Sequence, residues 1–180
     1  MEVLLFSTSV LIDYRNATKV SNITNIVAIA GISDTGYALD SSGHVWSWGY
    51  GQQGQLGNGT TTASQLTPVQ VSNISNIIAI AGGTSFYALD SSGKVWAWGD
   101  NTSGQLGNGT YTTALTPVQV SNISGIVSIA GGYLAGYALN SSGQIWSWGK
   151  NNIAQLGTGT TNDSNIPVQV LQSGWTVPLP

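Results

Sequence analysis

The sequence contains no cysteine and very little charge. None of its 180 residues is cysteine, so disulfides and thiolate metal sites are excluded. Charged residues make up 6%, far below the roughly 25% of an ordinary soluble domain, so neutral polar side chains must provide solubility. The four basic residues, Arg15, Lys19, Lys94 and Lys150, are scattered along the chain. We therefore expect no nucleic-acid partner, because phosphates require clustered basic side chains.

Membrane spans and catalytic groupings are also missing from the sequence. No apolar run approaches the roughly 18 residues of a membrane-spanning helix, so we expect no membrane partner. His44 is the only histidine, and the seven acidic residues are scattered. No catalytic triad, metal cluster or carboxylate pair can be read from such a set. We therefore expect a protein that is not an enzyme and that carries no metal and no cofactor.

The cellular compartment is left undetermined by the sequence. Residues 1–12 are apolar, but Glu2 follows the initial methionine. The segment lacks the basic residues and the small-residue cleavage site that mark a signal peptide, so we do not interpret it as one. The low charge and the Thr/Asn-rich composition favour an extracellular or cell-surface location.

A fifty-residue repeat organises the rest of the chain. Trp-x-Trp-Gly occurs at 46–49, 96–99 and 146–149. Within each repeat, short β-branched or aromatic segments are bounded by Gly, Ser, Asn or Pro, as strands are. No segment has the 3.6-residue period of a helix, so we predict an all-β fold with four strands per repeat. In the middle copy the predicted strands are 77–81, 86–89, 94–98 and 117–120.

The paired tryptophans indicate how the repeats pack. A strand alternates its side chains, so Trp46 and Trp48 lie on one face, and Val45 and Ser47 lie on the other. A four-stranded sheet cannot bury such a face alone, and sheets that stack on their own copies form a propeller. The tryptophans are therefore interpreted as the structural core of the repeats: Trp46, Trp48, Trp96, Trp98, Trp146 and Trp148.

Polar and glycine-rich segments join the predicted strands. Asp-Ser-Ser-Gly at 40–43 and 90–93 is typical of a hairpin turn. Calcium binding is disfavoured there, because Asn140 replaces the acid in the third copy and no second carboxylate is near. Gly-Gln-Leu-Gly-Asn-Gly-Thr, beginning at residue 54, lacks the Lys-Ser/Thr ending of a phosphate loop, so we interpret it as a tight loop with a buried leucine. The double glycines, at 82–83 and 131–132, would permit close backbone approach.

These motifs resemble the repeat of the regulator of chromosome condensation (RCC1-type) family. The resemblance rests on Ala-Leu-Asp-Ser-Ser-Gly-x-Val-Trp-x-Trp-Gly, Gly-Gln-Leu-Gly-Asn-Gly-Thr, Pro-Val-Gln-Val and Ile-Ala-Gly-Gly, which recur in order over residues 20–170. It implies a β-propeller, usually of seven blades.

This chain holds only three such repeats, so the sequence predicts an incomplete ring. Open blade faces are an aggregation liability, and we expect a homo-oligomer, with a dimer favoured, that completes the ring. The rival interpretation is a fragment of a seven-bladed propeller. The predicted organisation is a non-repeat segment at 1–19 with a possible closing strand, repeats over 20–170 with blades at 26–71, 77–120 and 126–170, and a tail at 171–180.

Function is expected on the loops that differ between the copies. In an up-and-down sheet the first-to-second and third-to-fourth loops share one face, and in this chain those loops vary while the opposite loops are nearly constant. Variable loops with exposed tyrosines suit a protein-binding surface. Drift of unconstrained loops would produce the same pattern. The candidate partner-binding residues are Asp34, Tyr50, Ser85, Asp100, Tyr111, Tyr133, Leu134 and Lys150.

Three functions fit this sequence. The first is a non-catalytic module that binds another protein, as the β-lactamase-inhibiting members of the resembled family do. The second is a structural surface or cell-wall repeat protein. The third is guanine-nucleotide exchange on a small GTPase, which the resemblance implies through the founding member of the family. The chain shows no inserted wedge loop and little charge, which disfavours exchange.

Overall fold

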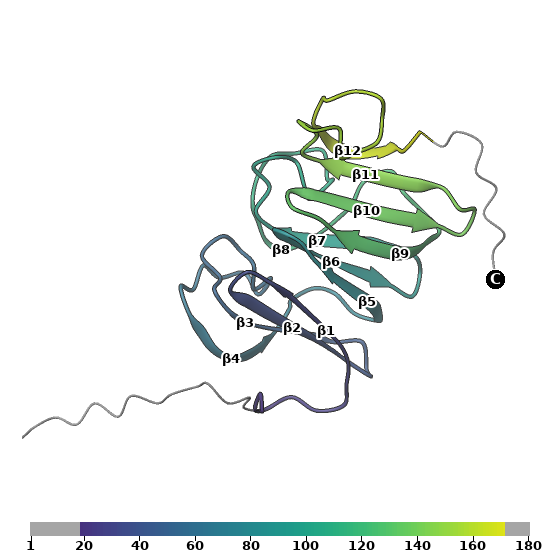
Figure 1. Cartoon of the computed structure of the whole chain (residues 1–180). Helices are drawn as coiled ribbons and strands as arrows, with labels where there is room; N and C mark the ends of the chain where they lie inside the picture. The colour runs from purple at the N-terminus through teal and green to yellow at the C-terminus, as the bar shows by residue number, and fades with distance from the viewer. Residues whose placement is uncertain (1–18, 172–180) are drawn as a thin grey trace, which may run out of the picture.

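Three four-stranded antiparallel sheets make up the chain (Figure 1). The computed structural model describes residues 19–171, and no helix occurs among them. The predicted all-β fold with three four-stranded blades is thereby confirmed, and the incomplete ring stays a prediction. Residues 1–18, including the predicted closing strand, and residues 172–180 lie outside the described part.

Each sheet is a meander whose strands pair in sequence order. Blade 1 comprises β1 (Ile26–Ile32), β2 (Thr35–Asp40), β3 (Val45–Gly49) and β4 (Gln65–Gln70). Blade 2 comprises β5 (Ile77–Gly82), β6 (Ser85–Asp90), β7 (Val95–Gly99) and β8 (Ala114–Gln119). Blade 3 comprises β9 (Ile126–Gly131), β10 (Ala135–Asn140), β11 (Ile145–Gly149) and β12 (Ser164–Gln169).

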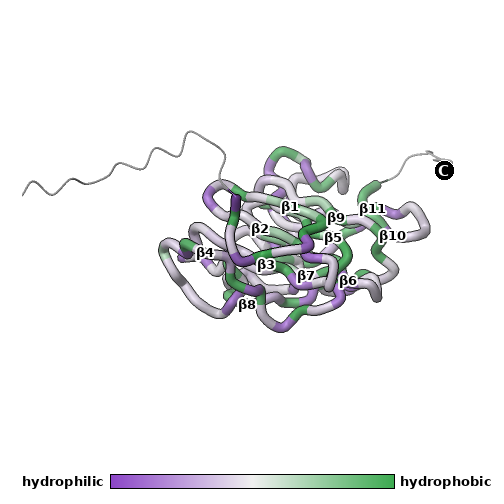
Figure 2. The backbone as a smooth tube through the Cα atoms, turned by 90° about the horizontal axis from the view of Figure 1, so that it is seen from below, coloured by the Kyte–Doolittle hydropathy of each residue, from purple (hydrophilic) through white to green (hydrophobic). Residues whose placement is uncertain are grey.

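The first strands β1, β5 and β9 lie side by side on the inner side of the blades (Figure 2). The predicted close approach of glycine backbones occurs between them. A Cβ on Gly131 would come within 2.4 Å of the Gly82 carbonyl oxygen, and one on Gly83 within 2.3 Å of that of Gly132. Only glycine fits such contacts, so these residues let the inner strands converge.

The fourth strands begin earlier than predicted. β8 starts at Ala114, whereas the predicted strand of this copy started at Pro117. That prediction used proline as the marker of a strand boundary. Because β8 is the outermost strand of its sheet, Pro117 can lie inside it without losing a required hydrogen bond.

The hairpin turns between the second and third strands are confirmed. Asp40 Oδ1 accepts hydrogen bonds from the backbone nitrogens of Ser42 (2.9 Å) and His44 (3.0 Å), and Gly43 has a φ of 80°. Asp40 Oδ2 accepts the Trp46 indole N–H at 3.0 Å. Burial alone would raise the pKa of the Asp40 carboxyl, but these hydrogen bonds outweigh burial and hold that pKa below its ordinary value.

Replacing Asp90 in the second of these turns tests its contribution. Asp90 accepts hydrogen bonds from the backbone of Ser92 and Lys94 and from Trp96 Nε1. We expect Asp90→Ala to lower the free energy of unfolding by about 2 kcal/mol at pH 7, and Asp90→Asn by less, because it keeps one acceptor oxygen. Denaturant unfolding measures both.

Acid should reduce the difference between wild type and Asp90→Asn. Burial opposes ionisation of Asp90, but its hydrogen bonds hold the pKa lower in the folded chain. A lowered pKa stabilises the fold above the unfolded-state value of about 3.9, and this stabilisation disappears as the pH falls through the folded value. Equal differences at pH 7 and at about pH 2.5 would contradict this account.

Two apolar clusters hold the blades together, one at each junction. The first includes Tyr37 of blade 1 with Phe86 and Trp98 of blade 2. The second includes Tyr87 of blade 2 with Trp148 of blade 3. The alternation predicted for the tryptophan strand is therefore observed, because each buried tryptophan faces the preceding blade.

Candidate binding site on the variable loop face

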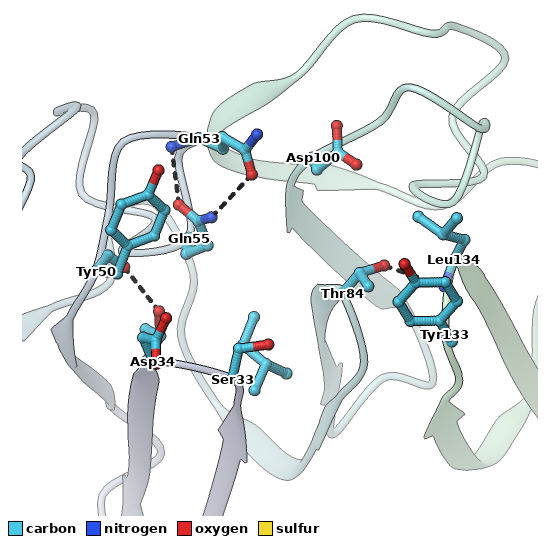
Figure 3. A pocket seen from close by; sticks show the side chains of 11 residues that line it. Ser33, Asp34, Tyr50, Gln53, Gln55, Thr84, Asp100, Tyr133 and Leu134 are labelled. Carbon is cyan, nitrogen blue, oxygen red and sulfur yellow. Dashed lines mark hydrogen bonds between the residues drawn. The ribbon is translucent and has the colours of Figure 1, made fainter.

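Loops from all three blades surround one hollow of about 270 Å³ (Figure 3). Blade 1 contributes its β1–β2 loop and the residues after β3, while blades 2 and 3 contribute the residues around Thr84 and Tyr133. The two sets of loops that the sequence predicts on one face therefore do meet. In Figure 3, Tyr50 and Asp34 lie on one side of the hollow, and Tyr133 lies on the other.

Five of the eight candidate residues line this hollow, which we call the loop-face pocket. Asp34 and Tyr50 come from blade 1, Asp100 from blade 2, and Tyr133 and Leu134 from blade 3. Tyr133 is 82% exposed, so its ring is presented to solvent. Residues that differ between the copies thus converge on one place.

The other three candidates lie elsewhere. Ser85 is buried, and its hydroxyl donates to the Asp100 carbonyl oxygen at 2.5 Å. Lys150 pairs with Asp163 at 3.5 Å and borders a neighbouring hollow of about 410 Å³ that also touches Tyr133. Tyr111 is exposed in the β7–β8 loop and is not among the residues that line the loop-face pocket.

Hydrogen bonds within blade 1 fix the first side of the pocket. The Tyr50 backbone N–H donates to the Asp34 carbonyl oxygen at 2.9 Å, and the Thr35 hydroxyl donates to the Tyr50 carbonyl oxygen at 2.7 Å. These bonds join the β1–β2 loop to the end of β3. Lys150 and Leu134 form the matching backbone bond in blade 3, at 2.8 Å. The scaffold under the loops is therefore repeated even where the side chains differ.

The two carboxylates of the pocket have different surroundings. Asp100 accepts hydrogen bonds from the Thr102 backbone (3.1 Å) and hydroxyl (3.0 Å) and from Gln105 Nε2 (2.8 Å). Within residues 19–171, no side chain or backbone N–H donates to the exposed Asp34 carboxylate. Asp34 is therefore the carboxylate that is available to a partner, while Asp100 mainly orders its own loop.

Six residues that line the pocket are not among the candidates: Ile32, Ser33, Thr35, Gln53, Gln55 and Thr84. Gln53 and Gln55 bond each other, with the Gln53 backbone N–H donating to Gln55 Oε1 at 2.8 Å. Thr84 Oγ1 accepts the Leu134 backbone N–H at 3.1 Å and so ties blade 2 to blade 3. The recurrence of glutamine at 55, 105 and 155 was the available signal for Gln55. Thr84 lies in a first-to-second loop, one of the variable loops that the sequence places on this face, but it was not selected as a candidate.

The pocket is acidic and has no basic residue in its lining. In the described part of the chain, no three His, Cys, Asp or Glu side chains are grouped so as to hold a metal ion. No helix among the described residues is long and apolar enough to cross a membrane. The arrangement offers carboxylate, amide and phenol groups for hydrogen bonding, beside two aromatic rings.

The fold and the repeated junctions define a propeller-type repeat protein. The model of the regulator of chromosome condensation (RCC1) repeat matches residues 42–89, 92–138 and 142–175. A second model of the same repeat matches residues 77–105. The chain therefore belongs to the regulator of chromosome condensation repeat family, as its motifs indicated.

Solved structures show the same fold. The human protein WBSCR16 is 26% identical with a TM-score of 0.71, covering 80% of this chain and 37% of its own. Prp20p of Saccharomyces cerevisiae, studied for binding to Gsp1p and histones, is 22% identical with a TM-score of 0.75, covering 83% of this chain and 39% of its own. Yeast RCC1 (Prp20) bound to Kap60 is 21% identical with a TM-score of 0.75, covering 84% and 38%. The chain thus spans less than two fifths of the length of each.

Proposed function

We propose that the chain is a non-catalytic module that binds another protein through the loop-face pocket. The observation that supports this most directly is the convergence of five copy-specific residues from three blades on one hollow. Exposed loops on a rigid scaffold are a common place for recognition. The binding of Gsp1p, histones and Kap60 by yeast relatives supports a protein as the partner.

The chemistry of the pocket favours a partner segment with a basic side chain. The Asp34 carboxylate is free of donors within the described residues, and no basic residue of the lining competes for it. Tyr50 and Tyr133 supply large contact surfaces with two rotatable bonds each, which lowers the entropic cost of binding. An arginine or lysine side chain of the partner would pair with the Asp34 carboxylate and contact the tyrosine rings.

We propose further that the chain forms a homo-oligomer, with a dimer favoured, and that it acts outside the cell or at the cell surface. Support for association comes from apolar blade faces that the described residues leave open. Support for the location comes from the low charge and the Thr/Asn-rich composition.

Guanine-nucleotide exchange is the second candidate function. It is supported by membership of a family whose founding member has this activity, and by the Gsp1p binding studied for Prp20p. Faster release of a fluorescent guanine nucleotide from a small GTPase, in the presence of this chain, would replace the non-catalytic proposal. A purely structural surface protein would show neither exchange nor pocket-dependent binding.

Substitution of Tyr133 tests the loop-face pocket, with Tyr111 as the matched control. Both are exposed loop tyrosines, but Tyr111 does not line the pocket. We expect Tyr133→Ala, alone or with Tyr50→Ala, to weaken capture of the partner by at least about tenfold. Tyr111→Ala should bind like wild type, and all variants should keep the wild-type thermal midpoint. Equal capture by wild type and the pocket variants would refute the proposal.

A further inference from the structure

The first and last blades each leave one apolar face open among the described residues. The open face of blade 1, here the tryptophan face, carries Ile29, Ala38 and Trp48 around a hollow of about 370 Å³. The open face of blade 3, here the tyrosine face, carries Tyr137, Leu139 and Ile145 around a hollow of about 170 Å³. The equivalent faces of the other blades are buried at the two junctions within the chain.

The two internal junctions show what covers each kind of face. At both junctions the face that carries tyrosine, leucine and valine packs against the next blade's face that carries alanine and tryptophan. Tyr37, Leu39 and Val45 of blade 1 meet Ala88 and Trp98 of blade 2 in this way. The tryptophan face and the tyrosine face are therefore the two halves of a third junction, present on one chain.

Burial at equivalent positions shows that no described residue packs over these halves as the blades pack at the internal junctions. Val45 and Val95 are each 1% exposed, whereas Ile145, which takes their place in blade 3, is 37% exposed. Ile29 is 80% exposed, while its blade 2 equivalent Ile80 packs against the first core cluster. Side chains at equivalent positions are thus buried at the internal junctions and exposed on the first and last blades.

Among the described residues, a hydrogen bond that recurs at both internal junctions lacks its acceptor at the first blade and its donor at the last. Trp98 Nε1 donates to the Gln55 carbonyl oxygen and Trp148 Nε1 to that of Gln105, each at 2.9 Å and each across a junction. No described residue accepts from Trp48 Nε1. The matching acceptor, the Gln155 carbonyl oxygen, receives the Tyr137 hydroxyl at 3.1 Å but no indole from residues 19–171.

The glycine-rich loop of blade 3 is shaped for that indole. Gly57 and Gly107 have φ values of 63° and 62°, and a Cβ on either would come within 3 Å of the indole of the next blade. Gly157 has the same φ of 63°, yet no indole lies against it among the described residues. Charge repulsion would not oppose contact between the two faces. Lys19 is the one charged residue that lines the tryptophan-face hollow, and no charged residue lines the tyrosine-face hollow.

We propose that the tryptophan face of one chain docks on the tyrosine face of a second copy, with Trp48 Nε1 donating to the second copy's Gln155 carbonyl oxygen. The contact is head-to-tail, so two copies that form it twice make a closed ring when the rotation between blades allows closure. Such a ring has six blades, within the range of four to eight known for propellers. This inference rests on the proposed self-association and is independent of the loop-face pocket.

Charge substitutions on the two faces test the docking mode. We expect the wild type to have twice the 18.6 kDa mass of the chain by light scattering at micromolar concentration. Ile29→Lys and Ile145→Lys should each weaken association by about hundredfold or more, because each would bury an unpaired ammonium group at both junctions. Ile78→Lys is the control, since Ile78 is 59% exposed on the middle blade and belongs to neither face.

A mixing experiment separates head-to-tail docking from other arrangements. The Ile29→Lys chain keeps an intact tyrosine face, and the Ile145→Lys chain keeps an intact tryptophan face. A tagged Ile29→Lys chain should therefore capture the Ile145→Lys chain far better than it captures itself. A monomeric wild type would overturn self-association as a whole. A dimer that resists both substitutions, or a mixture that shows no preferential capture, would overturn head-to-tail docking alone.

Discussion

Trp98→Ala is expected to lower the free energy of unfolding by about 3–5 kcal/mol, the range for removing a fully buried large aromatic ring. Trp98 has no exposed surface, and its indole N–H donates to the Gln55 carbonyl oxygen across the first junction. Its ring also contacts Phe86 at a centroid distance of 4.8 Å and Tyr37 at 6.3 Å. The substitution therefore leaves a cavity where two blades meet, and it removes one of the two hydrogen bonds to the Gln55 carbonyl oxygen, which still accepts the Tyr37 hydroxyl.

Trp48→Ala is the matched comparison, because Trp48 takes the same repeat position on the open face. We expect it to cost about 1–2 kcal/mol, since less of its apolar surface is buried within one chain. Both substitutions should be made in the Ile29→Lys background, in which a second copy does not cover Trp48. Chemical denaturation with fluorescence detection measures both. Equal losses would show that the junction does not depend on the buried tryptophan.

The local structure of each blade was predictable because it depends on neighbouring residues. Alternation placed Trp96 and Trp98 on one face, and the Asp-Ser-Ser-Gly motif located the hairpin turn at Asp90. The leucine of the glycine-rich loop is buried as predicted, for example Leu106 with no exposed surface. Each of these inferences required only strand period or turn chemistry.

Hydrogen bonds to backbone acceptors, within and between blades, could not be read from the sequence. The Gln105 carbonyl oxygen accepts the Tyr87 hydroxyl at 2.7 Å and the Trp148 indole N–H at 2.9 Å, but a backbone acceptor leaves no mark on residue type. Buried Asn101 was also missed, although its amide donates to the carbonyl oxygens of Thr110 and Thr112 and holds the long β7–β8 loop together. Asn151 repeats this role, whereas blade 1 has Gly51 in its place.

The loop-face pocket was predictable as a face but not as a set of residues. Strand direction alone places the variable loops together, and this brings Asp34, Tyr50 and Tyr133 to one hollow. Ser85 was expected in a loop, but it is the first residue of β6, where it is buried and its hydroxyl donates to the Asp100 carbonyl oxygen. Comparison of the repeats therefore identifies the loop face, and the structure shows which of its residues line the pocket.

Gly107→Ala should be strongly destabilising, although it adds only one methyl group. Gly107 has a φ of 62°, which strains any residue with a Cβ, and this strain alone costs on the order of 1 kcal/mol. The added Cβ would also lie 2.8 Å from Trp148 Cδ1, inside a fully buried junction. Together the strain and the displaced ring should lower the free energy of unfolding by about 3 kcal/mol or more.

Gly157→Ala separates the two causes, because Gly157 has the same φ but meets only the Val170 side chain, at 3.0 Å. In a monomeric background it should cost little more than the backbone strain, about 1 kcal/mol. In the otherwise wild-type chain it should also weaken self-association, since its Cβ would occupy the place where Gly107 accommodates an indole. A Gly157→Ala chain that is as destabilised as Gly107→Ala in the monomer would show that backbone strain, and not the indole contact, makes glycine necessary in this loop.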